Sequence, residues 1–269
     1  MGIRIETVVD KEIIFLPITD STNEEAKRLA QKDAKEGTVV TADVQTAGKG
    51  RKGRSWHTGE KTTLAMSFLL RPYENVGLLP DQASMITLVA AVSVAKAIEK
   101  MMKKTGVKEV PEILIKWPND IVINGKKACG ILTEMQLKGC DIDYVVVGIG
   151  VNVNQNGFPE DIEDIATSMR METGFSFDRD ELLDGIMNEF GHFYPLFCSK
   201  KDLSLLKDTY EELLINKNRE VKVLDPKGEY QGIALGIDHE GQLLVKLADG
   251  NIRPIYAGEV SVRGLYGYV

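Results

Sequence analysis

The chain contains few residues of the kinds that form disulfides or bind transition metals: its 269 residues include three cysteines and three histidines. Cys129, Cys140 and Cys198 are odd in number and show no paired CxxC spacing. This argues against a disulfide framework or a cysteine-based zinc site, and it fits a reducing cytoplasm. The histidines are too few for a multi-histidine metal centre, and none lies in a motif that would support a Ser-His-Asp relay. We therefore assign no metal site to protein ligands.

The sequence also lacks long apolar runs and an excess of positive charge. No run approaches the roughly 20 apolar residues that a membrane span needs, so we expect a cytoplasmic protein without a membrane partner. The formal net charge is −7. A nucleic-acid surface needs an extended basic footprint with stacking aromatic residues, so we expect no nucleic-acid partner.

Apolar periodicity and turn residues predict a mixture of strands and helices over the first 216 residues. Thr22 and Glu25 have the spacing of a capping box, and Asn124-Gly125 between two apolar runs predicts a hairpin. The helix that begins at Pro80 is the predicted central core helix because of its length and apolar face. The predicted strands lie at 12–18, 38–45, 62–70, on both sides of the turn within 112–137, and at 143–154, and the predicted helices at 21–37, 80–104, 179–197 and 200–215.

The texture of the sequence changes after Asn216. Four short apolar segments follow, separated by turns that contain glycine, and short strands at such close spacing are typical of a small barrel. We therefore expect two domains, 1–216 and 217–269. The predicted fold class is α+β, with a mixed, largely antiparallel sheet and packed helices, followed by a small all-β domain.

A basic, glycine-rich segment is the first candidate for function. Gly48–Arg54, GKGRKGR, satisfies G-x-G-x-x-G, but a dinucleotide site needs a helix directly after it, and here the next predicted element is a strand. Glycine lets backbone N–H groups approach an anion closely, and cationic side chains neutralise its charge. Phosphorylated metabolites and solvent both remain possible partners of its four cationic residues, Lys49, Arg51, Lys52 and Arg54.

A second motif, KWPND at Lys116–Asp120, lies just before the predicted hairpin. Trp117-Pro118 is unusual inside a sheet because proline removes a ladder donor, so Asn119 and Asp120 are expected to begin a new strand. An ordinary hairpin with incidental polar residues explains this segment equally well when it is considered alone.

Together these motifs resemble those of the biotin protein ligases, also called biotin–[acetyl-CoA-carboxylase] ligases. That family carries G-[RK]-G-R-x-G-R, matched by 48–54, and K-W-P-N-D followed by a lysine before G-I-L, matched by 116–120 and 127–132. The segments GIGVNVN at 148–154 and STN at 21–23 follow the family's order. No room precedes FLPITDSTNEEA for a helix-turn-helix domain, so the chain resembles the monofunctional class without a repressor role.

The resemblance implies a class II aminoacyl-tRNA-synthetase-like catalytic domain and an SH3-like C-terminal barrel. It further implies that ATP and Mg²⁺ activate biotin as biotinyl-5′-AMP, and that a lysine of a biotin carboxyl carrier protein then receives the biotinyl group. Related ligases often form homodimers, so a homodimer is expected. A lipoate-type ligase of the same fold is the alternative enzyme, and a non-catalytic binding module is the alternative of another class.

The family's functional residues carry over to matching positions of this sequence. Ser21 and Thr22 also suit helix capping, Lys116 also suits a structural salt bridge, and Trp56 also suits a core position. Asp120 is expected to orient or deprotonate the incoming lysine or to help bind metal. The implied catalytic residues are Arg51, Lys127 and Asp120; the implied biotin-binding residues are Ser21, Thr22, Asn23, Gln45, Lys49, Gly50, Arg51, Lys127 and Gly130; the implied ATP-binding or adenylate-binding residues are Arg51, Arg54, Trp56, Lys116, Asn119, Lys127 and Asn152.

Overall fold

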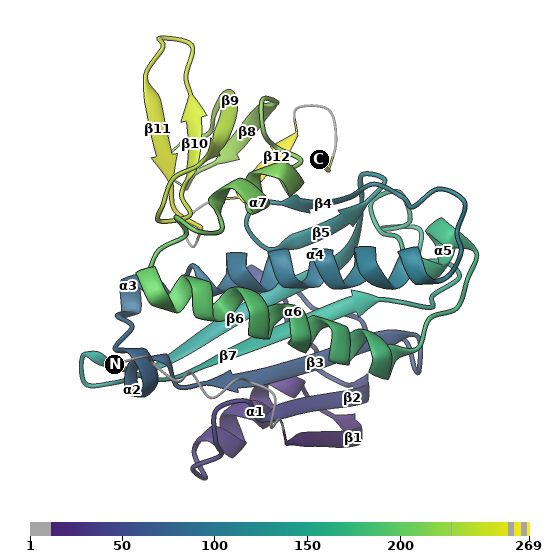
Figure 1. Ribbon diagram of the computed structural model, residues 1–269. Coiled ribbons are helices and arrows are strands. Elements are labelled where there is room, and N and C mark those ends of the chain that lie inside the picture. The colour runs from purple at the N-terminus through teal and green to yellow at the C-terminus, as the bar shows by residue number, and fades with distance from the viewer. Residues whose placement is uncertain (1–11, 227, 258–260, 265–267) are drawn as a thin grey trace.

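The computed structural model describes residues 12–226, 228–257, 261–264 and 268–269. Residues 1–11 of the expected first domain, and 227, 258–260 and 265–267 of the expected second one, lie outside the described residues. Two β-sheets organise the chain: a seven-stranded sheet of order β1-β2-β3-β7-β6-β5-β4 and a five-stranded sheet of order β11-β10-β9-β8-β12 (Figure 1).

The large sheet is mixed but mostly antiparallel, as the sequence predicts. β1 and β2 are parallel because α1 connects them, whereas every other neighbouring pair is antiparallel. Asn124 and Gly125 have positive φ values of 49° and 79°, which confirms the predicted hairpin between β5 and β6. The strands are β1 Ile13–Thr19, β2 Val39–Gln45, β3 Thr63–Leu70, β4 Ile113–Lys116, β5 Asp120–Ile123, β6 Lys126–Lys138 and β7 Asp141–Asn152.

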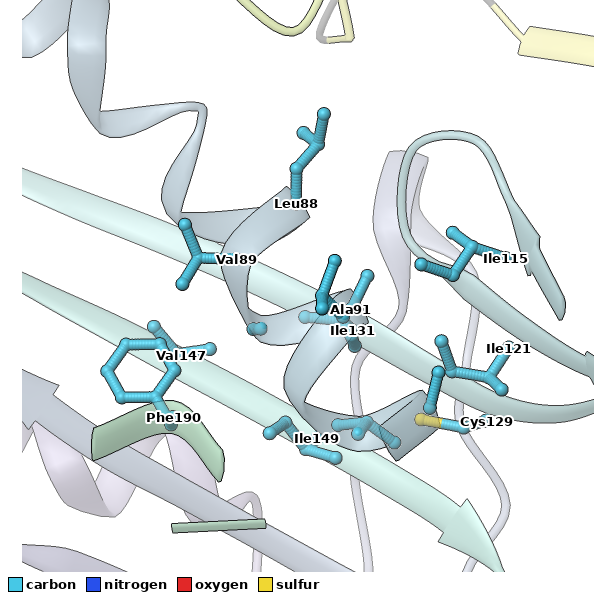
Figure 2. Packing of buried hydrophobic residues seen from close by; sticks show 14 of the residues in the cluster. Leu88, Val89, Ala91, Ile115, Ile121, Cys129, Ile131, Val147, Ile149 and Phe190 are labelled. Atoms are coloured by element: carbon cyan, nitrogen blue, oxygen red, sulfur yellow. The ribbon is translucent and has the colours of Figure 1, made fainter. Parts of the chain in front are cut away.

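Helices cover both faces of this sheet. α4 and α6 lie across one face, and α1 packs on the other against β2, β3 and β7 (Figure 1). Figure 2 shows Leu88 and Val89 of α4 above the strands that carry Ile131, Val147 and Ile149. Each fully buried aliphatic side chain contributes about 1.5 to 3 kcal/mol of transfer free energy, so this layer fixes the strands that carry the site. The helices are α1 Thr22–Ala30, the 3₁₀ turn η1 Arg51–Gly53, α2 Pro72–Val76, α3 Pro80–Ala83, α4 Ile86–Lys104, α5 Met169–Thr173, α6 Arg179–Lys200 and α7 Lys207–Leu213.

Three helix predictions are wrong in length. The helix expected over 21–37 ends at Ala30, and Asp33 shortly beyond it has a left-handed φ of 60°. The helix expected over 80–104 is divided into α3 and α4 by residues 84 and 85. The helix expected over 200–215 begins only at Lys207, because Lys201 takes a left-handed φ of 60° and ends α6.

The predicted capping box is also wrong. Ser21 is the residue that precedes α1, and its side chain makes no capping hydrogen bond, while Thr22 is already helical. The Thr22 hydroxyl lies 3.2 Å from Gln45 Oε1, so it is used between elements. Helix capping therefore does not account for either side chain, and both are buried.

The second sheet is joined to the rest of the structure by hydrogen bonds to α7 and to the turn between β4 and β5. Trp117 Nε1 donates to the Gly241 carbonyl oxygen at 3.0 Å, and Ile237 N donates to Glu211 Oε1 at 3.0 Å. These contacts bring the five-stranded sheet over the β4–β5 end of the large sheet (Figure 1). All its neighbouring strands are antiparallel, which confirms the small all-β domain; they are β8 Glu220–Leu224, β9 Tyr230–Ile237, β10 Leu243–Lys246, β11 Ile252–Ile255 and β12 Ser261–Gly264.

Candidate active site

Glycines on the central strands leave bare backbone on which other side chains lie. A Cβ atom at Gly150 would come within 2.4 Å of Trp56 Cε2, and one at Gly148 within 2.0 Å of Asn23 Oδ1. Both distances are below any real Cβ contact, so Trp56 and Asn23 can occupy these places only above glycine. Gly130, which pairs with Gly150, extends the same bare surface onto β6.

A polar cluster lies at the start of α1, beside this surface. Thr22 N donates to Gln45 Oε1 at 2.8 Å, and Gln45 Nε2 donates to Thr58 Oγ1 at 3.1 Å. Ser67 Oγ on β3 lies 2.7 Å from Thr22 Oγ1 and 2.6 Å from Asn23 Oδ1. The hydroxyl and amide groups are thus held in fixed orientations at one end of a pocket.

Two cavities meet over the bare backbone. The first lies beside Thr22 and Gln45 and has a volume of about 50 Å³; we call it the acid pocket because it is a candidate site for an organic acid. The second lies beside Lys116 and Arg54 and has a volume of about 530 Å³; we call it the cation cavity because of these cationic side chains. Predicted residues that line only the acid pocket are Ser21, Thr22, Asn23, Gln45, Lys49 and Gly130; those that line only the cation cavity are Arg54, Lys116 and Asp120; those that line both are Gly50, Arg51, Trp56, Asn119 and Lys127.

A β-bulge sets the direction of the Lys127 side chain. Asp120 pairs with Gly130 and Ile121 with Cys129, but Val122 pairs with Lys127, so Ala128 is an extra residue in β6. Strict alternation would place Lys127 and Gly130 on opposite faces of the sheet. Because of the bulge, Lys127 points to the same side as Gly130 and Asp120, and Lys127 Nζ lies 2.8 Å from Asp120 Oδ1.

The Asp120 carboxylate is held by three donors. Lys127 Nζ and Asn119 Nδ2 lie 2.8 and 3.1 Å from Oδ1, and Tyr268 donates its hydroxyl to Oδ2 at 2.5 Å. Tyr268 also places its ring 3.3 Å below Lys116 Nζ, measured to the ring centroid. The C-terminal part of the chain therefore forms one wall of the cation cavity.

Arg51 belongs to the loop of residues 45–56 and forms hydrogen bonds with residues near both sheets. Its Nη1 donates to Asn119 Oδ1 at 2.5 Å, and its Nη2 donates to the carbonyl oxygen of Ala257. Burial lowers the pKa of Arg51, Asp120 raises it, and the neighbouring Arg54 lowers it. Burial, Arg51 and Arg54 likewise lower the pKa of Lys52. A carboxylate or phosphate placed among these cations would relieve their mutual repulsion.

Trp56 closes the junction of the two cavities. Its ring covers Gly150, and Lys127 Nζ lies 5.8 Å from the ring centroid. Its Nε1 is buried and has no hydrogen-bond partner among the described residues. An unpaired buried donor costs about 1 to 3 kcal/mol, so this N–H is suited to an acceptor on a ligand.

The structure brings together every predicted site residue except Asn152. The Asn152 side chain lines neither cavity, because its Nδ2 donates to the Thr167 carbonyl oxygen and its Oδ1 accepts from Gln155 Nε2. Sequence reasoning missed Ser67, Tyr268 and the Ala257 carbonyl group. A serine inside an apolar strand is a weak signal for the first, and no local pattern marks the other two.

Comparisons with known proteins agree with this geometry. Residues 15–152 match the biotin/lipoate A/B protein ligase family, and residues 218–263 match the biotin protein ligase C-terminal domain. The chain is 39% identical to the bifunctional ligase/repressor BirA of Bacillus subtilis over 97% of this chain and 77% of that protein. It is 31% identical to the biotin–[acetyl-CoA-carboxylase] ligase of Paracoccus denitrificans over 93% of this chain and 100% of that protein. The biotin protein ligase of Aquifex aeolicus, solved in complex with biotin and ATP, superposes with a TM-score of 0.80 at 34% identity, covering 94% of this chain and 99% of that one.

Proposed function

Since this chain belongs to the biotin/lipoate A/B protein ligase family, we propose that it is a biotin protein ligase. It activates biotin with ATP as biotinyl-5′-AMP and transfers the biotinyl group to a lysine of a carrier protein. The observation that supports this most directly is the junction of the two cavities, where Arg51 and Lys127 line both. A carboxylate in the acid pocket and a phosphate in the cation cavity would meet at these two cations.

In the first reaction a carboxylate oxygen of biotin attacks the α-phosphorus of ATP, and the bond from that phosphorus to the α,β-bridging oxygen breaks. Two anions must approach, and negative charge accumulates on the leaving pyrophosphate. Preorganised cations are the main catalytic requirement of such a step. We assign this role to Arg51 and Lys127, and we assign phosphate contacts to Lys116 and Arg54 as the cation-cavity lining supports.

The polar cluster supports the assignment of the acid pocket to biotin's ring. The ureido group carries both donors and acceptors, so it needs polar partners in a pocket that is otherwise apolar. We propose that Ser21, Thr22 and Gln45 supply them, with Asn23, Lys49, Gly50 and Gly130 lining the pocket around the ring. Trp56 would pack against the adenylate, and Asn119 would hold Arg51 through the hydrogen bond described above. Asn152, which lines neither cavity, receives no ligand contact in this proposal.

In the second reaction the amine of the carrier lysine attacks the carbonyl carbon of the mixed anhydride, the acyl–phosphate bond breaks, and AMP leaves. The amine loses a proton in this step, and the phosphate of the departing AMP can accept it. We propose that Asp120 acts mainly by orienting Lys127, because both its oxygens already accept hydrogen bonds or ion pairs. Exclusion of water by the basic loop and Trp56 would protect the anhydride from hydrolysis.

We propose that ATP binds together with Mg²⁺. The described residues contain no group of three or more His, Cys, Asp or Glu side chains that could hold a metal ion, so the chain builds no metal cage within those ranges. Mg²⁺ commonly binds through one or two carboxylates plus substrate phosphates. Among the described residues that line the cation cavity, Asp120 supplies a carboxylate, which would have to exchange one of its present donors for the ion. When bound, the ion would neutralise charge on the leaving pyrophosphate.

The decisive experiment is ATP-dependent transfer of labelled biotin to the carrier domain of a carboxylase. We expect label on the carrier only when ATP is present, and none on a carrier whose acceptor lysine is replaced by arginine. Lipoate should neither be transferred nor compete, since the loop and WPND motifs match the biotin branch. Transfer of lipoate in place of biotin would favour the alternative ligase, and no transfer of either acid would favour the non-catalytic binding module.

Three further expectations remain proposals. The acceptor is a biotin carboxyl carrier domain, the protein works as a cytoplasmic homodimer, and the boundary between its domains lies between residues 216 and 217. No helix within the described ranges is long and apolar enough to cross a membrane. Multi-angle light scattering tests the dimer, and expression of residues 1–216 and 217–269 separately tests the boundary.

A further inference from the structure

A chain of ion pairs runs from the basic loop to the acid pocket along α1. Lys49 Nζ lies 2.7 Å from Glu24 Oε1, and Lys27 Nζ lies 2.8 Å from the same oxygen. On its other side Lys27 Nζ lies 2.6 Å from Glu134 Oε1. The second oxygen of Glu134 accepts from Asn23 Nδ2 at 2.7 Å, so five side chains are linked without a gap.

Two lysines and two glutamates in this chain of ion pairs neutralise one another's charge. Two ammonium groups share one oxygen of Glu24, and their repulsion is offset because Glu134 holds one of them from behind. Hydrogen bonds from Lys27 and then from Lys49 hold the pKa of Glu24 below its ordinary value of 4.5. Burial lowers the pKa of Lys27, but Glu134 and Glu24 together raise it above its ordinary value. Loss of either acid would leave two cations facing one anion.

The inner end of the chain is rigid. Asn23 Oδ1 lies 2.6 Å from Ser67 Oγ, and its Nδ2 donates both to Glu134 and, at 3.3 Å, to the Leu132 carbonyl oxygen. Its amide also lies against Gly148, and its three hydrogen bonds fix its orientation there. The outer end, Lys49, is exposed and belongs to the loop that covers the pocket.

We propose that Glu24 and Glu134 are positioning residues that anchor the basic loop, residues 45–56, over the acid pocket through Lys27 and Lys49. Glu24 holds the loop directly. Glu134 acts through Lys27 and at the same time orients Asn23, so the lid and the pocket wall share one electrostatic network. The inference rests on the proposed function only where it identifies the acid as biotin.

Limited trypsin digestion tests the anchor without any ligand, because the loop contains four cleavage sites, at Lys49, Arg51, Lys52 and Arg54. Partly exposed ion pairs are each weak, so we expect Glu24→Gln to raise the rate of loop cleavage by about threefold or more. Glu134→Gln should also raise it, by a smaller factor. Glu25→Gln is the matched control, since Glu25 is on the same helical turn but pairs with Arg28 at 2.7 Å outside this network.

Mass spectrometry of the fragments separates loop opening from general unfolding. If a variant is merely less stable, cuts elsewhere in the chain rise together with those at 49–54. Cleavage of Glu24→Gln at the rate of Glu25→Gln would overturn the anchor. If the loop of Glu24→Gln is cleaved faster than that of the control while the loop of Glu134→Gln is cleaved at the control rate, the proposed coupling between the loop and the pocket wall is wrong.

A second arm adds biotin before digestion. Biotin should protect the wild-type loop, and Glu24→Gln should need a severalfold higher biotin concentration for the same protection. If biotin protects neither protein while the ligand-free difference persists, the proposed substrate is wrong and the anchor stands. Equal biotin concentrations for half-protection in both proteins would contradict the anchor even if biotin is the substrate.

Discussion

Asp120 and Lys127 form an ion pair of 2.8 Å because an extra residue in β6 turns Lys127 toward the face that carries Asp120. The same bulge leaves Ala128 and Cys129 buried in the core beneath the site. Lys127 is thereby directed at the junction of the two cavities by the backbone as well as by its partner. Bulges next to active sites commonly re-aim a side chain in this way.

Replacing Arg51 should slow formation of the adenylate. Arg51→Ala removes a partly buried cation from the point where carboxylate and phosphate would meet, and losing one preorganised group of this kind costs about 3 kcal/mol, or roughly a hundredfold in rate. Biotin-dependent exchange of pyrophosphate into ATP measures this step. Arg253→Ala, in the second sheet and outside both cavity linings, is the control. Exchange within twofold of wild type for Arg51→Ala would contradict the assignment.

Lys127→Ala should weaken biotin binding and adenylation together. The change removes a cation that lines both cavities and leaves Asp120 without its ion-pair partner, so we expect the free energy of biotin binding to weaken by about 2 to 4 kcal/mol. Lys126→Ala is the matched control, because the adjacent Lys126 only donates to the Glu163 carbonyl oxygen at the surface. Isothermal titration with biotin should show a loss for Lys127→Ala alone, and unchanged biotin affinity would argue strongly against its role.

A methyl group on the floor of the acid pocket should disrupt it. Gly148→Ala forces a Cβ atom within 2.0 Å of Asn23 Oδ1, and three hydrogen bonds hold the Asn23 amide in that place. Overpacking of this kind costs about 1 to 3 kcal/mol of folding free energy and should lower biotin affinity at least tenfold. Gly157→Ala, where a Cβ would meet nothing within 4 Å, should behave like wild type in urea unfolding and biotin titration. Equal results for the two variants would show that the close approach is not rigid.

The partly buried carboxyl group of Glu36 should make the free energy of unfolding depend on pH. Burial raises its pKa, although the Arg71 backbone N–H donates to it at 2.5 Å. Because the pKa of this carboxyl group is higher in the folded state, its protonated form contributes to the free energy of unfolding. This contribution is complete below the ordinary pKa of 4.5 and is lost as the pH rises through the pKa of the folded state. Glu36→Gln should therefore raise the unfolding free energy at pH 7 by about 1 kcal/mol, with the gain shrinking at pH 4. Urea unfolding at both pH values checks this, with exposed Glu60→Gln as control; a gain of equal size at both would refute it.

Much of the fold could be predicted because its signals are local. The Asn124-Gly125 turn, the β-branched run of β2, the apolar run of β3 and the long apolar face of α4 are each signals read over neighbouring residues. The lengths of α1 and α7 could not, because left-handed residues such as Asp33 and Lys201 carry little sequence signal. The short helices α2 and α5 were missed for a similar reason, since five residues show no clear period.

The sequence indicated the site residues that lie in recognisable motifs, but not those that only the tertiary structure brings close to the site. Arg51, Lys127 and Asp120 follow from recognisable segments, but their mutual contacts depend on a bulge that alternation does not anticipate. Ser67 and Glu134 hydrogen-bond to the pocket residue Asn23 because strand pairing and packing on α1 bring together positions more than 40 residues apart. Such contacts are decided by tertiary structure, so residue identity alone did not reveal them.

Two of the contacts that close the cation cavity join residues very far apart in the chain: Arg51 with Ala257, at a separation of 206 positions, and Asp120 with Tyr268, at 148. During synthesis the ribosome adds residues in order, at about 5 to 20 per second. The sheet that carries the acid pocket can therefore assemble well before the cation cavity gains its last wall.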